Sequence, residues 1–393
     1  VFILNLTIHS EEIKTISPDG NIEINFRLSA KGEPEYRISY NNENFLSWSK
    51  LGLNFVESGK LTSGMQVVEV TSRTIDETYR IYSGKSKYSR NNCNETKVSL
   101  IEKSSPNRKL DIYLRAYNDG AAFRYGIPVQ ENLSSFMIST EETYYNFSGD
   151  YKCWAMKKDR FRHSYEGEYR EYNLSNINNK PGDSTSYFPY ITLPLTMKMN
   201  DGLYISVSEA NITNYPGMHL TKQDGYTLKS KLAPDSLKKN ISVRGNTPAV
   251  SPWRLFIIGS RPGALIESNL IMNLNDPNKI PDAESWIKPG KSTWSWWAED
   301  RGFDPSFGYH ILSTKTVKYY IDFAAANNFQ YVTLDGGWYG WFDATKDDAV
   351  HDITKSLPEL DLPEVTRYAE SKGIGIILWV VWYELERQMK EAM

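Results

Sequence analysis

The 393-residue sequence has few of the residues that form disulfides or bind transition metals. It contains two cysteines, Cys93 and Cys153, and five histidines. Two cysteines could form a single disulfide, so they define neither a disulfide framework nor a redox compartment. The HExxH and CxxC patterns of common zinc sites are also missing. The sequence therefore gives no support to a zinc enzyme.

The sequence also lacks a strong excess of charge and a long apolar run. Its 45 Lys and Arg residues and 48 Asp and Glu residues give a net charge of -3. Such a balance offers no electrostatic reason to expect nucleic acid or an acidic membrane as a partner. The longest apolar stretch, Ile374–Trp382, is about half of what a membrane-spanning helix needs. We therefore expect no nucleic-acid partner and no membrane span.

Two common enzyme motifs are missing as well. No GxGxxG turn follows a predicted strand, which disfavours a nucleotide-binding Rossmann fold. No GxSxG sequence is present to support a serine esterase.

Up to about residue 260 the sequence shows the alternation of β-strands. Apolar and polar residues alternate in several short runs, among them Asn21–Leu28, Lys97–Ile101, Leu110–Ala116 and Leu203–Val207. Turn sequences such as Asn118-Asp119-Gly120 separate these runs. Many short strands with hardly any helical pattern predict a large antiparallel β-sandwich. We assign residues 1–270 to this domain and residues 271–288 to a linker.

Residues 289–393 show a different pattern, in which predicted strands and helices alternate. Predicted strands lie at Lys291–Trp297, Tyr331–Asp335 and Gly375–Trp382, and predicted helices at Ser313–Ala326, at Leu362–Ser371 and from Tyr383 onward. Three βα units fit the start of a (β/α)8 TIM barrel, with a doubly wound sheet as the alternative. A whole barrel needs eight units, so we expect the chain to be a fragment.

Several segments carry a resemblance to one family. Residues 110–125 (LDIYLRAYNDGAAFRY), residues 201–210 (DGLYISVSEA), residues 214–218 (NYPGM) and residues 247–254 (TPAVSPWR) follow one another in order. They resemble the N-terminal domain of glycoside hydrolase family 97, in which a β-sandwich precedes a TIM-barrel catalytic domain. The resemblance implies an exo-acting glycosidase, an α-glucosidase or α-galactosidase, with a calcium ion at its active site.

The same resemblance implies one metal ligand in the sandwich. Glu209 matches the Glu of the family's "HEA" segment, and Ser208 stands where the family often has His. Ca²⁺ prefers carboxylate and other oxygen ligands, so this role suits a Glu. The alternative is a strand-end Glu in solvent or in an ion pair. Glu166 and Glu168 lie in another segment similar to the family's cleft, or in a solvated loop.

Glycoside hydrolysis requires two carboxyl groups that flank the scissile bond. In the family these come from the fourth barrel strand and later loops, so we expect the catalytic residues beyond Met393. Glu299 and Asp300 do not resemble catalytic residues. The remaining candidates are substrate-binding residues at strand ends: Trp297, Asp335, Trp338 and Trp382. Trp faces cover the apolar C–H surfaces of sugars, but Trp near barrel strands is also ordinary core.

The sequence therefore predicts a calcium-dependent exo-acting α-glycoside hydrolase whose substrate is an oligosaccharide or α-glycoside. This chain alone is expected to be inactive. One alternative is a non-catalytic carbohydrate-binding protein. Another is a sugar epimerase, which would need a carboxylate beside His163 or His219. Family resemblance also leads us to expect a periplasmic or secreted location.

Overall fold

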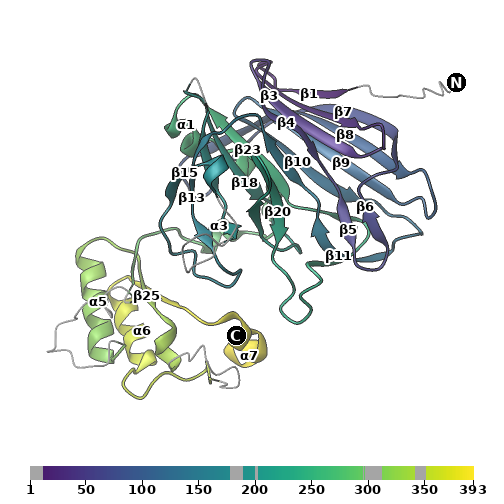
Figure 1. The fold of residues 1–393 in the computed structure, drawn as a ribbon. Coiled ribbons are helices and arrows are strands. Elements are labelled where there is room, and N and C mark those ends of the chain that lie inside the picture. Colours follow the sequence, from purple (N-terminus) through teal and green to yellow (C-terminus); the bar gives the residue numbers. More distant parts are fainter. Residues whose placement is uncertain (1–11, 178–188, 200–201, 295, 297–311, 341–350) are drawn as a thin grey trace. The chain divides into compact units, whose positions relative to one another are not determined.

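The structure is a computed structural model that describes residues 12–177, 189–199, 202–294, 296, 312–340 and 351–393. The chain divides into two compact units, Val1–Lys279 and Ile280–Met393 (Figure 1). The division falls inside the stretch that the sequence predicts as a linker.

The first unit consists mainly of antiparallel sheets. In the described part of the chain, one nine-stranded sheet has the order β1 (Ile13–Ile16), β2 (Ile22–Leu28), β3 (Pro34–Tyr40), β4 (Glu43–Lys50), β12 (Tyr144–Phe147), β20 (Thr227–Leu232), β19 (Met218–Lys222), β16 (Tyr190–Ile191) and β14 (Lys157–Lys158).

A ten-stranded sheet has the order β15 (Arg170–Asn173), β13 (Lys152–Ala155), β17 (Leu195–Lys198), β18 (Tyr204–Ala210), β23 (Trp253–Gly259), β10 (Gly120–Ile127), β9 (Lys109–Tyr117), β8 (Tyr88–Glu102) and β7 (Met65–Arg80), with β22 (Ala249–Val250) paired to β10. A four-stranded sheet has the order β21 (Val243–Asn246), β11 (Ser135–Glu141), β5 (Leu53–Phe55) and β6 (Gly59–Leu61). A short 3-10 helix, η1, covers Leu174–Asn176.

The two large sheets pack face to face on one apolar core. The alternation of β2 places Ile22, Ile24 and Phe26 on the buried face. Rings from the two sheets meet across the interface, with the centroid of Tyr36 on β3 lying 4.5 Å from that of Phe123 on β10. The unit is thus a β-sandwich, as its alternating sequence predicts.

Two short helices pack on the outer side of the ten-stranded sheet. They are α1 (Pro262–Glu267) and α2 (Leu270–Asn273). Leu270 and Leu274 join Trp253, Leu255 and Cys93 in a second buried cluster there. Cys93 and Cys153 are both buried and free, so they do not form a disulfide.

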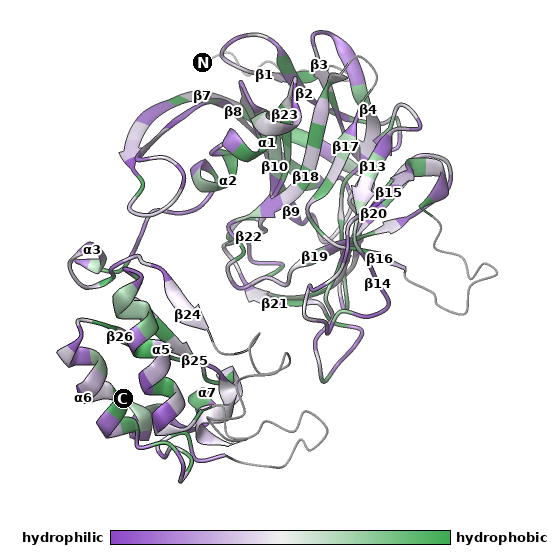
Figure 2. Ribbon diagram, turned by 90° about the vertical axis from the view of Figure 1, so that its left-hand side faces the viewer, coloured by the Kyte–Doolittle hydropathy of each residue, from purple (hydrophilic) through white to green (hydrophobic). Residues whose placement is uncertain are grey.

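The second unit is a parallel α/β unit. Its strands β24 (Ser292–Trp294), β25 (Tyr331–Leu334) and β26 (Gly375–Leu378) form a parallel sheet in that order. The described helices are α3 (Ala283–Trp286), α5 (Thr314–Ala326), α6 (Leu362–Ser371) and α7 (Trp382–Ala392), with a 3-10 helix η4 at Gly336–Tyr339. Both α5 and α6 mix hydrophobic and hydrophilic residues (Figure 2).

Capping and packing explain the two longer helices of this unit. The Ser313 hydroxyl accepts from the Thr316 amide at the start of α5, and the Asp361 carboxylate accepts from the Glu364 amide at the start of α6. Val317 and Ile321 of α5 pack with Val332 on β25. This arrangement confirms three βα units typical of the start of a TIM barrel.

Several details differ from the sequence prediction. The first strand of this unit covers only Ser292–Trp294 of the predicted Lys291–Trp297. The third strand ends at Leu378, and Trp382 is the first residue of α7 rather than the end of a strand. The predicted linker contains α3 and the end of α2. Among the described residues, no helix is both long and apolar enough to cross a membrane.

Candidate functional site

Glu209 lies near the end of β18, where it faces Arg254 on the neighbouring strand β23. The two residues are directly opposite in the antiparallel register, which brings their side chains together. Arg254 Nη1 donates to Glu209 Oε2 at 2.6 Å, and the Met218 amide donates to Glu209 Oε1 at 3.0 Å. The Glu209 side chain is 10% exposed, so its carboxylate is largely but not wholly removed from water.

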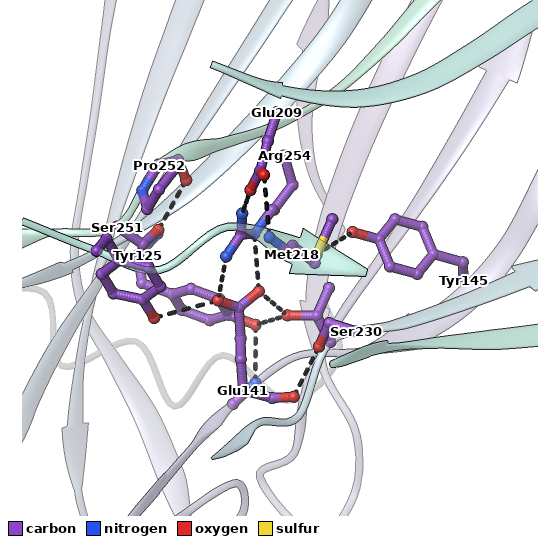
Figure 3. A network of polar contacts seen from close by, with 12 residues as sticks. Tyr125, Glu141, Tyr145, Glu209, Met218, Ser230, Ser251, Pro252 and Arg254 are labelled. Atoms are coloured by element: carbon purple, nitrogen blue, oxygen red, sulfur yellow. Dashed lines mark hydrogen bonds and ion pairs between the residues drawn. The ribbon is translucent and has the colours of Figure 1, made fainter. Parts of the chain in front are cut away.

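Arg254 also binds a second carboxylate, that of Glu141 at the end of β11. Its Nε donates to Oε1 at 2.9 Å and its Nη2 to Oε2 at 2.6 Å, so the pair is bidentate. Both side chains are 0% exposed. Figure 3 shows the guanidinium between the two carboxylates. One arginine therefore connects strands from two sheets.

Hydroxyl groups complete the surroundings of Glu141. Thr143 donates to Oε1 at 2.8 Å, and Tyr215 donates to Oε2 at 3.2 Å. The Tyr125 hydroxyl lies 2.6 Å from that of Thr143 and accepts from the Gly52 amide. Because these partners fix Glu141, the position of the Arg254 guanidinium is also fixed.

The buried cluster carries one more negative than positive charge when all three groups are ionised. Burial raises the pKa of Glu209, although Arg254 opposes this effect. Burial alone would lower the pKa of Arg254, but Glu141 and Glu209 together raise it well above its usual value. The site therefore favours a cation beside Glu209 on electrostatic grounds.

A complete calcium site needs more ligands than Glu209 provides. Ca²⁺ takes about six to eight oxygen ligands. No group of three or more His, Cys, Asp or Glu side chains in the described ranges could hold a metal. Each Glu209 oxygen accepts one hydrogen bond and keeps a lone pair, so it fits the role of one ligand. The described part of the chain does not by itself form a whole site.

A cavity of about 640 Å³ borders this cluster in the first unit. The Tyr125 and Tyr215 side chains belong both to its wall and to the hydrogen-bonded cluster. Asn214 and Asn246 add amide groups to the same wall, beside apolar side chains such as that of Phe136. This volume and this mixture of apolar and amide groups are typical of small-molecule sites.

In the second unit, Asp335 links the carboxyl ends of two strands. It follows β25, and its Oδ1 accepts from the Gly336 amide at 2.6 Å. Its Oδ2 accepts from the indole N–H of Trp294, the last residue of β24. Both oxygens of Asp335 thus have local partners, which fits a structural group at a strand end. The predicted binding of substrate by Asp335 is not tested by these contacts and stays a prediction.

The predicted tryptophans have different surroundings. Trp338 is 3% exposed, and its indole N–H donates to the Trp379 carbonyl at 2.8 Å, so it packs in the core. Trp382 is 73% exposed at the start of α7. Trp297 lies outside the described residues. The sugar-binding role of these three residues stays a prediction.

The other acidic and histidine candidates that the structure describes are two exposed carboxylates and a pair of histidines. Glu166 and Glu168 are exposed, with Glu168 3.6 Å from Arg170. Glu299 and Asp300 lie outside the described residues. His163 and His219 contact each other, with 3.2 Å between their Nε2 atoms.

Sequence reasoning missed several residues that the structure brings to these sites. Glu141 lies in the segment Ser139–Glu142, which has no motif that would single it out. Trp294 and Trp379 are 47% and 42% exposed beside Asp335 and Gly336. Only strand register or tertiary packing identifies these contacts.

Comparison with known proteins covers almost the whole chain. Residues 16–277 match the family model for the glycosyl-hydrolase 97 N-terminal domain, and residues 296–393 match that for glycoside hydrolase 97. A retaining α-galactosidase of Bacteroides thetaiotaomicron is 27% identical over an alignment of 418 positions, which covers 99% of this chain and 59% of that protein. A probable retaining α-galactosidase of Streptomyces bingchenggensis is 24% identical, covering 89% of this chain and 49% of that protein.

Solved structures give the same result for the fold. A family 97 enzyme from Pseudoalteromonas sp. strain K8, in complex with acarbose, has a TM-score of 0.84 and 26% identity, covering 97% of this chain and 56% of that one. A β-arabinopyranosidase with a TM-score of 0.75 and 21% identity supports the fold alone. The chain thus spans between about half and three fifths of the length of these relatives. The two family models together with the sandwich and barrel units show that this chain belongs to glycoside hydrolase family 97.

Proposed function

We propose that this chain is part of an exo-acting α-glycoside hydrolase, with α-galactosides as the first substrates to test and α-glucosides as the second. The alignment over 99% of the chain with a retaining α-galactosidase carries this proposal. The similar Pseudoalteromonas enzyme has been solved with acarbose and with panose, which is the reason for testing glucosides as well.

We further propose that Glu209 contributes one ligand to a calcium ion. Three observations support this role: its carboxylate is partly exposed, its oxygens keep lone pairs, and its cluster has an excess negative charge. When bound, the ion would supply a positive charge that polarises an oxygen of the substrate. Arg254 and the Met218 amide would hold the Glu209 carboxylate in one orientation.

The described carboxylates in these clusters are poorly suited to act as acid and base. Glu141 is fully buried against Arg254, and Asp335 is bonded to Trp294 and Gly336. Glycosidases need one protonated carboxyl and one ionised carboxylate on either side of the bond. We therefore propose that these groups orient the metal and the substrate, and that the 393-residue chain alone does not hydrolyse glycosides.

The test compares two proteins on the same substrates. The product of the complete open reading frame and the 393-residue chain are assayed with 4-nitrophenyl α-galactoside, α-glucoside and β-galactoside. We expect the former to hydrolyse at least one α-glycoside and the latter to hydrolyse none. Cleavage of the β-galactoside alone would overturn the proposed substrate class, and turnover by the 393-residue chain would overturn the proposed division of roles.

The cavity beside the buried cluster favours a second candidate function, binding of carbohydrate without chemistry. Asn214 and Asn246 have the amide groups that recognise sugar hydroxyls, and the tyrosines offer rings for contact. Titration calorimetry with methyl α-galactoside and methyl α-glucoside tests this alternative. It would gain support if Asn246→Ala weakened binding in a full-length protein that showed no turnover.

A further inference from the structure

A cluster of aromatic rings lies next to the Glu209 site. His219 follows Met218, whose amide donates to Glu209. Around His219 are the rings of Phe161, His163 and Tyr165, with centroid distances of 5.0, 5.5 and 6.1 Å. We call these four residues together with Tyr190, at 6.1 Å, the His219 ring cluster.

Tyr165 is the member of this cluster most open to solvent. Tyr165 is 52% exposed, whereas His219 is 3% exposed. Its backbone has φ = 59°, a left-handed conformation that is unusual for a bulky residue. Strained backbone of this kind persists only when neighbouring groups hold it, and it is concentrated at functional sites. The surroundings of Tyr165 should therefore contain the groups that hold it.

Those groups are the two histidines. The Tyr165 amide donates to His163 Nδ1 at 3.1 Å, and the two rings pack with centroids 4.2 Å apart. Because His163 Nδ1 accepts a hydrogen bond, the neutral His163 ring carries its proton on Nε2. This Nε2–H then donates to His219 Nε2, and the two nitrogens are 3.2 Å apart. The neutral His219 then carries its proton on Nδ1, which has no hydrogen-bond partner among the described residues. The contacts thus assign one tautomer to each ring.

This arrangement exists only while both rings are neutral. A proton added to His163 would place an N–H against the Tyr165 amide, and one added to His219 would place an N–H against His163. Burial lowers the pKa of both rings; Lys158 contributes to the shift of His163, and His163 to that of His219. The other ionisable groups near the cluster are Asp159 beside His163, Tyr190 on β16, and Glu209 and Tyr169, which both act on Tyr165.

We propose that Tyr165 contacts the pyranoside ring of the substrate, and that the hydrogen bond between neutral His163 and His219 holds it in position beside Glu209. The exposed ring offers an aromatic face to the apolar C–H groups of a sugar. This inference rests on the proposed function, because it assigns the sugar to the neighbourhood of Glu209. Tyr165 is thereby a substrate-contacting residue, and His163 and His219 are positioning residues.

The test uses the product of the complete open reading frame and measures kcat and KM on the better of the two aryl α-glycosides. Tyr165→Ala removes the ring and is expected to raise KM roughly tenfold with a smaller change in kcat. Tyr165→Phe keeps the ring face and should stay near the wild-type KM. Tyr88→Ala is the control, because Tyr88 is similarly exposed, at 56%, at the start of β8.

The histidine contact is tested with two substitutions at one position. The side-chain carbonyl of Gln can accept the proton of His163 Nε2–H, so His219→Gln should keep a KM near that of the wild type. His219→Leu fills space without an acceptor and should raise KM as Tyr165→Ala does. Hydrogen exchange of the Tyr165 amide provides a readout without substrate: we expect faster exchange in His219→Leu and protection in His219→Gln.

The outcomes separate the inference from the function on which it rests. An active wild type with an unchanged KM in Tyr165→Ala would overturn the inference and leave the proposed function intact. Equal KM values and equal amide exchange in the Gln and Leu variants would overturn the role of the histidines. A full-length protein that neither hydrolyses nor binds either α-glycoside would remove both proposals together. Unfolding temperatures identify any variant that has lost its fold. If Tyr165→Ala or His219→Leu has done so, the KM values of the conservative variants Tyr165→Phe and His219→Gln test the inference instead.

Discussion

Arg254 donates to Glu209 at 2.6 Å across two neighbouring strands, and it does so from a position that is wholly shielded from solvent. The same guanidinium holds Glu141, so a single residue joins the candidate metal ligand to a second buried carboxylate. Removing charge from this cluster should therefore affect both stability and the metal site.

Arg254→Met should be strongly destabilising, because it leaves two buried carboxylates without their cation. We expect a loss of about 3–5 kcal/mol in the free energy of unfolding, measured by urea denaturation of the sandwich. Arg244→Met is the matched control, since the side chains of the Arg244–Asp235 pair are 46% and 25% exposed and pairs in contact with solvent contribute about 1 kcal/mol or less. Equal losses for the two variants would contradict the account of the buried cluster.

Glu209→Gln should weaken calcium binding, because a neutral amide oxygen is a poorer ligand than a carboxylate. In the full-length protein we expect added calcium to raise the unfolding temperature of the wild type and to have little effect on the variant. Glu168→Gln is the control, because the Glu168 side chain is 82% exposed. The assignment would be wrong if Glu209→Gln responded to calcium as the wild type does.

The two units have separate apolar cores, so core substitutions should act on one unit at a time. Phe256→Ala in the sandwich and Ile321→Ala in the second unit both remove fully buried side chains. We expect losses of about 3–5 and 2–5 kcal/mol, each confined to the unfolding of its own unit. Hydrogen exchange resolved by segment measures this. A loss of protection in both units from either substitution would show that they unfold as one.

His219 should make stability depend on pH. Burial, with a smaller contribution from His163, lowers the pKa of His219 from its usual 6.5 to about 4. The native state therefore binds a proton less readily than the unfolded chain. The stabilisation is complete above pH 6.5 and is lost as the pH falls from there to about 4, with a slope of at most about 1.4 kcal/mol per pH unit.

The measurement for this effect compares urea denaturation of the wild type and His219→Gln between pH 7.5 and 4. Other groups titrate in both proteins, so the difference between the two curves isolates His219. We expect the variant to lose less stability over this window. Parallel curves would mean that His219 is not held neutral in the native state.

Local sequence patterns predicted the architecture well, because alternation and helical spacing depend on burial of one face. The period-2 runs became the sandwich strands, and Leu362–Ser371 became α6 with the predicted bounds. The end of the third strand was misplaced because Val380, Val381 and Trp382 continue an apolar run, although the chain turns into α7 there. Apolar runs alone do not distinguish a strand from a helix start.

The site was less predictable than the fold, because its contacts join residues far apart in the chain. Glu209 was singled out through a family resemblance, while its partner Glu141 is 113 positions from Arg254 and carries no local pattern. Asp335 was expected at a strand end, but its bond to Trp294 depends on the pairing of β24 with β25. Strand register between distant segments follows from packing and cannot be predicted from the sequence of one short segment.

The most direct test of the central claim is hydrolysis of 4-nitrophenyl α-galactoside and α-glucoside by the product of the complete open reading frame, followed by proton NMR. We predict release of a monosaccharide from at least one of them, with loss of activity on chelation of calcium and recovery when calcium is restored. The anomer formed first would then identify a retaining or an inverting mechanism. No hydrolysis of either α-glycoside in the presence of calcium would contradict the account.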